Sequence, residues 1–400
     1  MPRVGGIRQW GVPPLPRVGG IMAKRNSRDR RNVRRKSKKR VDRSRDQAGL
    51  PELSLLTELP EYDDLHPSTE QVSAFEAHCS KAEDASDLAL GCVVRLDRGF
   101  PAVLTSDEVF RAEFAAQLTK SDFSRVAVGD WVAVRTPHGH DMGLIESILP
   151  RESDIARWRG GSRGEKQTLA ANVDVVIVVQ ALEKGRLSVN RIARSAVVAT
   201  DCGADVAVVL AKCDSVSEEE VRAAKESVQE VLGENCPVIC SAVDGDNMSG
   251  IEDVRSLVPT GRIGIMLGPS GAGKSTLLNA LLGREALETG SVRESDGVGR
   301  HTTVTRRMVA IPSAGIIVDE PGLRTLQMVG HERGLAKVFP DIADAAASCR
   351  FRNCTHTHEP GCEVLARFGS GSDDRRLGVY LSLAEEMRES ATTLDPDIVL

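Results

Sequence analysis

The chain has 400 residues, of which 41% are hydrophobic and 27% are charged. This balance is typical of globular proteins with two or three domains and excludes a chain too polar to build a core. No apolar run approaches the length of a membrane span, and nine cysteines without a recognisable secretory segment favour a reducing compartment, the cytoplasm.

The net charge of −5 conceals a strongly basic stretch near the N-terminus. Between Lys24 and Arg45 the chain carries 13 lysines and arginines against 2 aspartates, with no apolar periodicity. We expect residues 1–48 to be a disordered basic arm that neutralises nucleic-acid phosphates, with a merely solvated charge run as the alternative.

Two further features flank the basic residues. Pro2–Ile7 recurs word for word as Pro16–Ile21, which indicates an upstream translated repeat and Met22 as the true start. Residues 49–88 are acidic and contain regularly spaced prolines, and we interpret them as a linker.

Five short runs of alternating apolar residues follow within residues 89–150, a pattern that predicts a small closed β-barrel. The runs are Cys92–Leu96, Ala102–Leu104, Val109–Ala112, Trp131–Arg135 and Gly143–Ile148. An OB barrel is the commonest of this kind that binds RNA, but strand number alone leaves an SH3-like barrel open. The basic segment Arg151–Lys166 around Trp158 is interpreted as a connector, which either stacks on a base or rests on its neighbour.

Buried strands then alternate with helices, which predicts an α/β domain over residues 168–329. The predicted strands are Val173–Val179, Val206–Leu210 and Pro237–Cys240, and the predicted helices are Val189–Ala199 and Ser217–Leu232. Only 3% of residues are aromatic, so aliphatic side chains must fill the core, as in parallel sheets covered on both faces.

A further apolar run, Ile263–Leu267, leads directly into a turn with the pattern Gly-x4-Gly-Lys-Ser. The turn and the start of the next helix comprise Gly268, Pro269, Ser270, Gly271, Ala272, Gly273, Lys274, Ser275 and Thr276. Glycines let successive N–H groups curl around phosphate oxygens, and the helix adds its positive dipole end. Lys274 would reach the β- and γ-phosphates and Ser275 would bind Mg²⁺. A glycine-rich turn without a ligand is disfavoured by the strand before it and the apolar helix after it, so a nucleoside triphosphate site is predicted.

Residues that could recognise the base come before this loop. Guanine offers two donors that one carboxylate can accept together, and Asp214 follows a predicted strand. In GTPases the base-reading motif is Asn-Lys-x-Asp, followed by Ser-Ala. Here the corresponding residues are Ala211, Lys212, Cys213 and Asp214, then Ser241 and Ala242. Since both motifs follow the phosphate loop in ordinary GTPases, the sheet is predicted to be circularly permuted.

Residues after the phosphate loop complete the predicted Mg²⁺ and γ-phosphate site. Thr302 and Thr303 offer hydroxyls for Mg²⁺, Asp319 would hold Mg²⁺ through water, and the N–H of Gly322 would sense the γ-phosphate.

Near the C-terminus, three cysteines and a histidine predict a structural zinc site, because such a set leaves no open coordination position. The ligands are Cys349, Cys354, His356 and Cys362. His358 is a competing ligand, and buried cysteines without metal remain the alternative. One helical face carries Leu377, Tyr380, Leu381, Ala384 and Met387. Arginines that would meet rRNA phosphates surround the site, namely Arg350, Arg352, Arg367, Arg375 and Arg376.

This order of motifs, from Gly91 to the C-terminus, resembles the circularly permuted, small-subunit-dependent GTPases of the RsgA (YjeQ) family. The resemblance implies a multidomain fold: an N-terminal OB-type β-barrel, a central circularly permuted P-loop GTPase domain, and a mostly helical zinc-binding domain at residues 330–400. It also implies a monomeric cytoplasmic enzyme, without membrane contact, that hydrolyses GTP with Mg²⁺ on the 30S subunit and its 16S rRNA late in subunit maturation.

Two residues bear on specificity and rate. Ala211 stands where the family has Asn, so we expect weaker guanine selectivity. Leu323 stands where Ras-like enzymes carry a water-orienting Gln, and the family account gives that task to a switch-loop histidine, here His301. We therefore expect slow intrinsic turnover and stimulation by the ribosome. The residues expected to act in catalysis are His301, Lys274, Thr302, Thr303, Asp319 and Gly322.

Two other functions compete with this interpretation. The phosphate loop and Ile316–Pro321 also resemble ABC ATPases, but only about fifty residues separate Gly268 from Asp319 and no Leu-Ser-Gly-Gly-Gln motif occurs. The other alternative is a nucleotide-gated RNA-binding factor with negligible intrinsic catalysis, which single-turnover rates with and without 30S subunits would distinguish.

Overall fold

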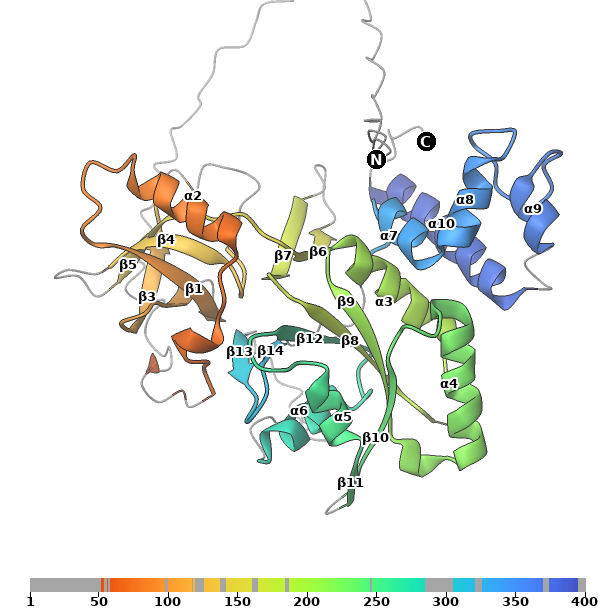
Figure 1. Ribbon diagram of the computed structural model, residues 1–400, viewed down its shortest axis with the longest axis horizontal. Helices are drawn as coiled ribbons and strands as arrows, with labels where there is room; N and C mark the ends of the chain where they lie inside the picture. The colour runs from red at the N-terminus through yellow and green to blue at the C-terminus, as the bar shows by residue number, and fades with distance from the viewer. Residues whose placement is uncertain are drawn as a thin grey trace, which may run out of the picture. The chain divides into compact units, whose positions relative to one another are not determined.

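The computed structural model describes residues 52–53, 56, 58–97, 100–116, 118, 126–136, 142–159, 165–183, 187–244, 247–284, 305–320, 326–369 and 374–394 (Figure 1). The predicted basic arm lies outside these ranges. Within them, no helix combines the length and the apolarity needed to cross a membrane.

The first five strands close into a barrel. They are β1 (Leu88–Asp97), β2 (Phe100–Leu104), β3 (Val109–Phe114), β4 (Trp131–Arg135) and β5 (Gly143–Ile148). Their pairing runs β1–β2–β3–β5–β4 and returns to β1, with β3 and β5 parallel. An antiparallel meander cannot contain that parallel pair, whereas a Greek-key OB barrel can. The pairing therefore confirms the OB barrel and resolves the question that strand number left open.

The acidic segment predicted as a linker is folded, so that prediction was wrong. It contains a 3₁₀ turn, η2 (Tyr62–Asp64), and a helix, α2 (Thr69–Cys79). The Ser68 hydroxyl accepts from the Gln71 N–H while the Gln71 side chain accepts from the Ser68 N–H, which is a capping box. The ring of Tyr62 packs edge-on against Trp131 of the barrel, with 5.9 Å between centroids. The prolines of this segment favour a linker, whereas Ser68 followed by Gln71 three residues later predicts the start of a helix.

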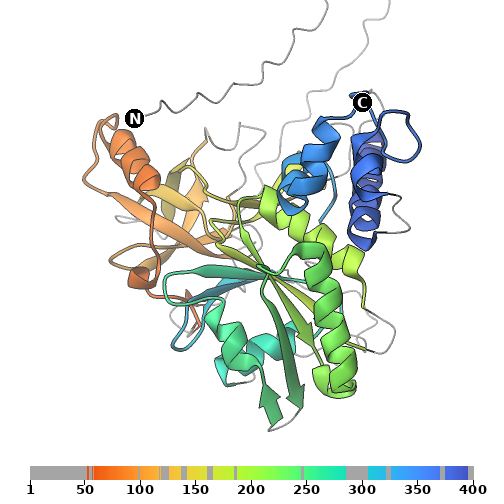
Figure 2. The same ribbon diagram turned by 45° about the vertical axis from the view of Figure 1, so that its right-hand side comes forward.

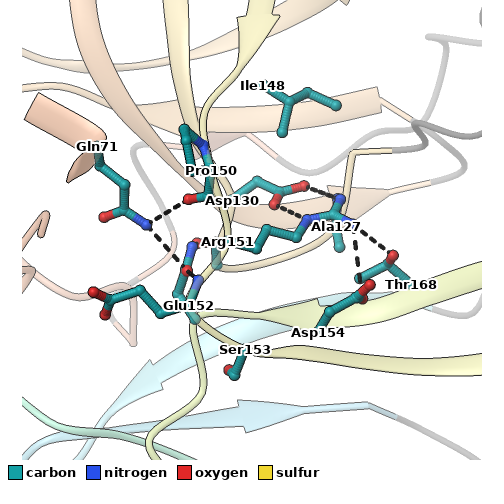
Figure 3. A network of polar contacts seen from close by, with 12 residues as sticks. Gln71, Ala127, Asp130, Ile148, Pro150, Arg151, Glu152, Ser153, Asp154 and Thr168 are labelled. Carbon is teal, nitrogen blue, oxygen red and sulfur yellow. Dashed lines mark hydrogen bonds and ion pairs between the residues drawn. The ribbon is translucent and has the colours of Figure 1, made fainter. Parts of the chain in front are cut away.

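The predicted basic connector contributes to a two-stranded antiparallel sheet, β6 (Asp154–Arg159) and β7 (Glu165–Ala171). Figure 3 shows that the Arg151 side chain faces Asp130 instead of solvent: its Nε and Nη2 donate to the fully buried Asp130 carboxylate at 2.6 and 2.8 Å. Arg151 Nη1 also donates to Thr168 Oγ1 at 2.7 Å. Arg151 therefore joins the barrel to the hairpin and is not available as a nucleic-acid contact.

The second part of the chain builds a mostly parallel sheet in the order β11–β10–β9–β8–β12–β14–β13. Its strands are β8 (Val175–Ala181), β9 (Asp205–Ala211), β10 (Val238–Asp244), β11 (Asn247–Ser249), β12 (Ile263–Leu267), β13 (Arg306–Ala310) and β14 (Ile316–Asp319). Only β11 and β13 run antiparallel to their neighbours. The predicted α/β pattern and the permuted order of its strands are confirmed.

Helices cover both faces of this sheet, as Figures 1 and 2 show. The helices α3 (Val189–Asp201) and α4 (Glu218–Leu232) pack with Val176 and Val178 of β8, whereas α5 (Ile251–Ser256) and α6 (Lys274–Leu282) pack with Ile177. Because side chains alternate along a strand, the continuous apolar run of β8 serves both layers.

The C-terminal part is helical: α7 (Glu332–Val338), α8 (Pro340–Ala347), α9 (Glu363–Phe368) and α10 (Arg375–Leu394). The predicted apolar face of α10 is confirmed at Leu377, Tyr380 and Met387, which are buried. Arg194 of α3 donates to Glu386 of α10 at 2.5 Å. This helix therefore packs on the α/β part as well as on the zinc loop.

The barrel and the α/β sheet are joined strand to strand. β1 pairs with β13 antiparallel, with Arg95 opposite Arg307 and Leu96 opposite Arg306. Asp97, only 2% exposed, accepts from Arg95 Nε at 2.7 Å and from Thr305 Oγ1 at 3.0 Å. Asp97, Arg95 and Thr305 thus form a buried polar joint between β1 and β13, at the point where the chain enters β13.

Candidate nucleotide site and metal centre

The residues predicted to bind nucleotide lie at one edge of the parallel sheet. Ser241 pairs with Ala211 on β10 and β9, and Ala211 pairs with Ala181 on β8. β12 runs parallel to β8 and to β14, so Gly268 and Asp319 follow carboxyl ends of the same polarity. In open α/β sheets ligands bind beyond the carboxyl ends of the strands. Although the motifs occur in a permuted order along the chain, they therefore all lie at one edge of the sheet, the shared carboxyl edge.

Glycine is required in the phosphate loop for two different reasons. A Cβ on Gly268 would lie 2.2 Å from the carbonyl oxygen of Val179, so the loop leaves β12 against the backbone of β8. Gly271 and Gly273 instead have φ angles of +77° and +93°, which side-chain-bearing residues rarely adopt. The loop curls and α6 begins at Lys274.

Lys274 lies over this loop. Its Nζ donates to the carbonyl oxygens of Gly268 and Pro269 at 2.6 and 3.0 Å. The ammonium therefore sits at the mouth of the nest of N–H groups, where phosphate oxygens would compete for it. Ser275 and Thr276 follow in the first turn of α6 and are half-buried.

Asp319 ends β14 and faces basic residues of β13. Arg307 Nε lies 3.6 Å from the Asp319 carboxylate, and Arg306 forms an ion pair with the neighbouring Glu320, which is buried. Burial raises the pKa of Glu320, and the Arg306 guanidinium opposes that rise. His301, Thr302, Thr303, Gly322 and Leu323 lie outside the described residues.

The predicted base-reading motif follows β9 in a tight turn. Lys212 has φ +61°, in the left-handed region that few residues other than glycine adopt, and it precedes the 3₁₀ turn η3 (Cys213–Ser215) that carries Asp214. Lys212 Nζ pairs with Glu183 at 3.0 Å. Strained backbone of this kind occurs at ligand sites more often than elsewhere. The sequence does not predict that Glu183 pairs with Lys212, because no motif spacing relates the two residues.

Ala211 lies beside the phosphate loop. It is buried, and a Cβ built on Gly273 would be 3.6 Å from the Ala211 Cβ. An asparagine at residue 211 would therefore reach toward the loop. Alanine offers no polar group that could connect this loop with the predicted base-reading residues.

The four predicted zinc ligands come together. Their ligand atoms all lie within 4.8 Å of one another. His356 Nδ1 is 3.5 Å from the sulfurs of both Cys349 and Cys362, which are 3.9 Å apart. A tetrahedral zinc ion with ordinary bond lengths would separate two sulfurs by about 3.8 Å and a sulfur from a nitrogen by about 3.6 Å. The donor set therefore fits zinc in both identity and spacing.

The remaining histidine of this loop is used differently. His358 is exposed, and its Nδ1 lies 2.9 Å from the Thr357 hydroxyl. Among the described residues the metal cluster contains His356 and not His358. The carboxylate of Glu359 accepts from the backbone N–H groups of Thr355 and Thr357, so it orders the loop between the second and fourth ligands.

The arginines predicted to meet rRNA fall into two groups. Arg375 donates to Ser227 and Glu230 of α4, and Arg376 pairs with Asp341 and covers the Phe339 ring, so both dock α10. Arg367 pairs with Glu363 of its own helix at 2.8 Å, whereas Arg350 and Arg352 are exposed next to the zinc loop. Only the second group remains a surface suited to phosphate.

Comparison with known proteins decides the family. The model of the RsgA GTPase family matches residues 148–329. A protein of Streptomyces coelicolor called small ribosomal subunit biogenesis GTPase RsgA is 40% identical over 78% of this chain and 84% of its own length. A protein of the same name from Streptomyces avermitilis is 39% identical over similar shares, 78% and 83%.

The chain belongs to the RsgA GTPase family. The solved structure of YjeQ from Thermotoga maritima covers 75% of this chain and 99% of its own, with 25% identity and a TM-score of 0.55. YloQ, described as a circularly permuted GTPase, covers 77% and 98% at a TM-score of 0.53 and, at 20% identity, supports the fold alone. The expected family and fold class are thus confirmed, and the roles of the individual site residues stay predictions.

Proposed function

We propose that this RsgA-family chain hydrolyses GTP to GDP and phosphate on the small ribosomal subunit and acts in the late maturation of that subunit. The observation that carries the proposal is the shared carboxyl edge, where a Gly-x4-Gly-Lys-Ser loop stands beside Lys212 to Asp214 and Ser241 although the motifs follow a permuted order. The names of the Streptomyces relatives support the ribosomal assignment.

Each group of residues has a proposed task. The N–H groups of the loop and Lys274 hold the phosphates, Asp214 accepts from guanine, and Ser241 and Ala242 back the base. Mg²⁺, through which the phosphates are neutralised, would be held by Ser275 and, through water, by Asp319. His301 would orient the attacking water, Thr302 and Thr303 would contact the metal, and the Gly322 N–H would sense the γ-phosphate.

Docking would use residues other than those of the nucleotide site. We propose that the basic arm at residues 1–48, the barrel at residues 89–150, and Arg350 and Arg352 beside the zinc loop contact 16S rRNA. Within the described barrel strands, Arg95, Arg111 and Arg135 are each paired with carboxylates of the same chain. The barrel would therefore recognise its partner through loops and shape more than through these charges. Zinc is proposed to order the third surface, and the protein would work as a cytoplasmic monomer.

Turnover measurements test this function directly. GTP and ATP hydrolysis should be compared with 30S subunits, with 50S subunits and without ribosomes, at equal salt. We expect slow GTP turnover alone, a large increase with 30S subunits only, and little ATP turnover. Equal rates in all three mixtures would reject the ribosomal assignment, and binding without any stimulated turnover would favour the nucleotide-gated RNA-binding alternative.

A further inference from the structure

Two cysteines that have no role in the proposed reaction flank the base site. Cys213 directly precedes Asp214 in η3, and Cys240 directly precedes Ser241 on β10. Cys213 follows β9 and Cys240 lies on the neighbouring strand β10, so both lie near the shared carboxyl edge of the sheet. Both are half-buried and pack against the same apolar core.

The backbone brings the two thiols together. Cys240 pairs with Leu210 across β10 and β9. The chain then turns after Ala211, and η3 comes to lie against β10. Cys213 Sγ reaches back to within 3.0 Å of the Leu210 carbonyl oxygen, which is the position opposite Cys240. The two thiols therefore lie close enough to interact, and the N–H of Ser241 contacts Cys213.

The surroundings favour a thiolate on one member of the pair. Interaction with the Cys213 thiol lowers the pKa of Cys240 to about 7, burial opposes this, and the ammonium of Lys225 on α4 adds to the lowering. Burial alone acts on Cys236, four residues before Cys240, and raises the pKa of the Cys236 thiol to about 11. A low-pKa thiolate beside a second thiol is the arrangement that peroxides convert to a disulfide.

We propose that Cys213 and Cys240 are a reversible oxidation site, at which hydrogen peroxide converts the two thiols to a disulfide that weakens guanine-nucleotide binding and that thiol reductants cleave again. The weakening rests on the proposed base site, since the disulfide would tether the turn carrying Asp214 to the strand carrying Ser241.

The chemistry balances with the peroxide as the only oxidant. The Cys240 thiolate attacks one peroxide oxygen, a sulfur–oxygen bond forms, the oxygen–oxygen bond breaks, and the leaving oxygen takes a proton to become water. The Cys213 thiol then attacks the Cys240 sulfur, a sulfur–sulfur bond forms, and hydroxide leaves with the Cys213 proton as a second water. Both sulfurs are oxidised and the peroxide is reduced to two waters.

The test uses the full-length reduced protein, treated with hydrogen peroxide and then alkylated. Peptide mapping should show Cys213 linked to Cys240, and GDP affinity should fall about ten-fold, as expected when a charge-assisted hydrogen bond is lost. Dithiothreitol should restore it. The Cys240→Ser variant should bind GDP like wild type and keep that affinity in peroxide. The matched control, Cys236→Ser, should lose affinity as wild type does.

Three results would overturn the proposal: no linked peptide, a linked peptide with GDP affinity unchanged within about two-fold, or an equal loss of affinity in Cys240→Ser. The linked peptide is detected without nucleotide. If the reduced wild-type protein bound no guanine nucleotide, the proposed function would fail on that ground alone, while the mapping would still report on the cysteine pair.

Discussion

Lys274 is the side chain on which phosphate binding should depend most. It is the charged residue of the loop, and its Nζ already lies at the loop mouth, 2.6 Å from Gly268 O. We expect Lys274→Ala to lower GTP turnover by about 10² or more, because a preorganised charge on the transferring phosphoryl group is lost. Steady-state kinetics measures this. Lys337→Ala, an exposed lysine on α7, is the control and should behave as wild type; undiminished turnover in Lys274→Ala would reject the site.

Asp214 should decide which base is bound. An amide donates where a carboxylate accepts, and xanthine presents an acceptor where guanine presents a donor. Asp214→Asn should therefore shift the ratio of XTP to GTP affinity by about ten-fold or more. Competition binding with both nucleotides measures the ratio. If the ratio did not move, a residue other than Asp214 would read the base.

Among the elements, the zinc loop should depend on its ion for order. Short loops such as this one gain much of their folding free energy from the metal. Cys354→Ser should lower the zinc content below one ion per chain and reduce the thermal stability of the helices after Gly330. Metal analysis and hydrogen exchange measure these two effects. Cys79→Ser, outside the cluster, should leave both unchanged, and full zinc content in Cys354→Ser would show that the ligand set is misassigned.

The polar joint between β1 and β13 should make stability depend on pH. Burial alone would raise the pKa of Asp97, but hydrogen bonds and charges from Arg95 and Arg111 lower it below its usual value. Because the folded pKa is depressed, the carboxylate stabilises the fold above the unfolded pKa of about 3.9, and this stabilisation is lost as pH falls through the folded pKa.

Asp97→Asn should accordingly cost about 3 kcal/mol of unfolding free energy at neutral pH, since it leaves buried guanidinium groups unpaired. Denaturant titrations of both proteins at several pH values measure the difference, which should shrink in acid below about pH 4. Asp107→Asn, in the exposed turn between β2 and β3, provides the comparison. A difference that stays constant with pH would mean that Asp97 stabilises the joint without its charge.

Local signals and long-range pairing differ in what a sequence reveals. The strand, the loop and α6 around Lys274 were predictable because periodicity and glycine spacing are local properties. Ser68 and Gln71 mark the start of α2, but the acidic, proline-containing composition of the same segment favours a linker, so the two local signals conflict. The pairings of β1 with β13 and of Glu183 with Lys212 join residues far apart in the chain, and no pattern within either segment encodes the partner.

For the whole molecule, activation should require the partner and His301 together. Leu323 cannot orient water, so the isolated protein should hydrolyse GTP slowly, and docking should bring His301 to the γ-phosphate. His301→Ala should leave GTP binding intact while the stimulation by 30S subunits disappears. GTP binding and stimulated turnover are measured on the same preparation. Loss of turnover with intact binding would identify His301 as catalytic and not merely solvated. Retained stimulation would exclude His301 from the reaction.

The pairing of β1 with β13 also bears on how the chain reaches its native state. During synthesis β1 leaves the ribosome long before β13 exists, because Arg95 and its partner Arg307 lie at opposite ends of the central part of the chain. The barrel can close early, because its strands are neighbours in the sequence. The backbone groups of β1 that pair with β13 then stay unpaired until β13 has been synthesised and has joined the sheet. Non-local pairing of this kind slows folding and leaves an edge open to association with other chains. We therefore expect the barrel strands to gain protection from hydrogen exchange before the sheet in refolding, and truncation after Leu282 to yield aggregates.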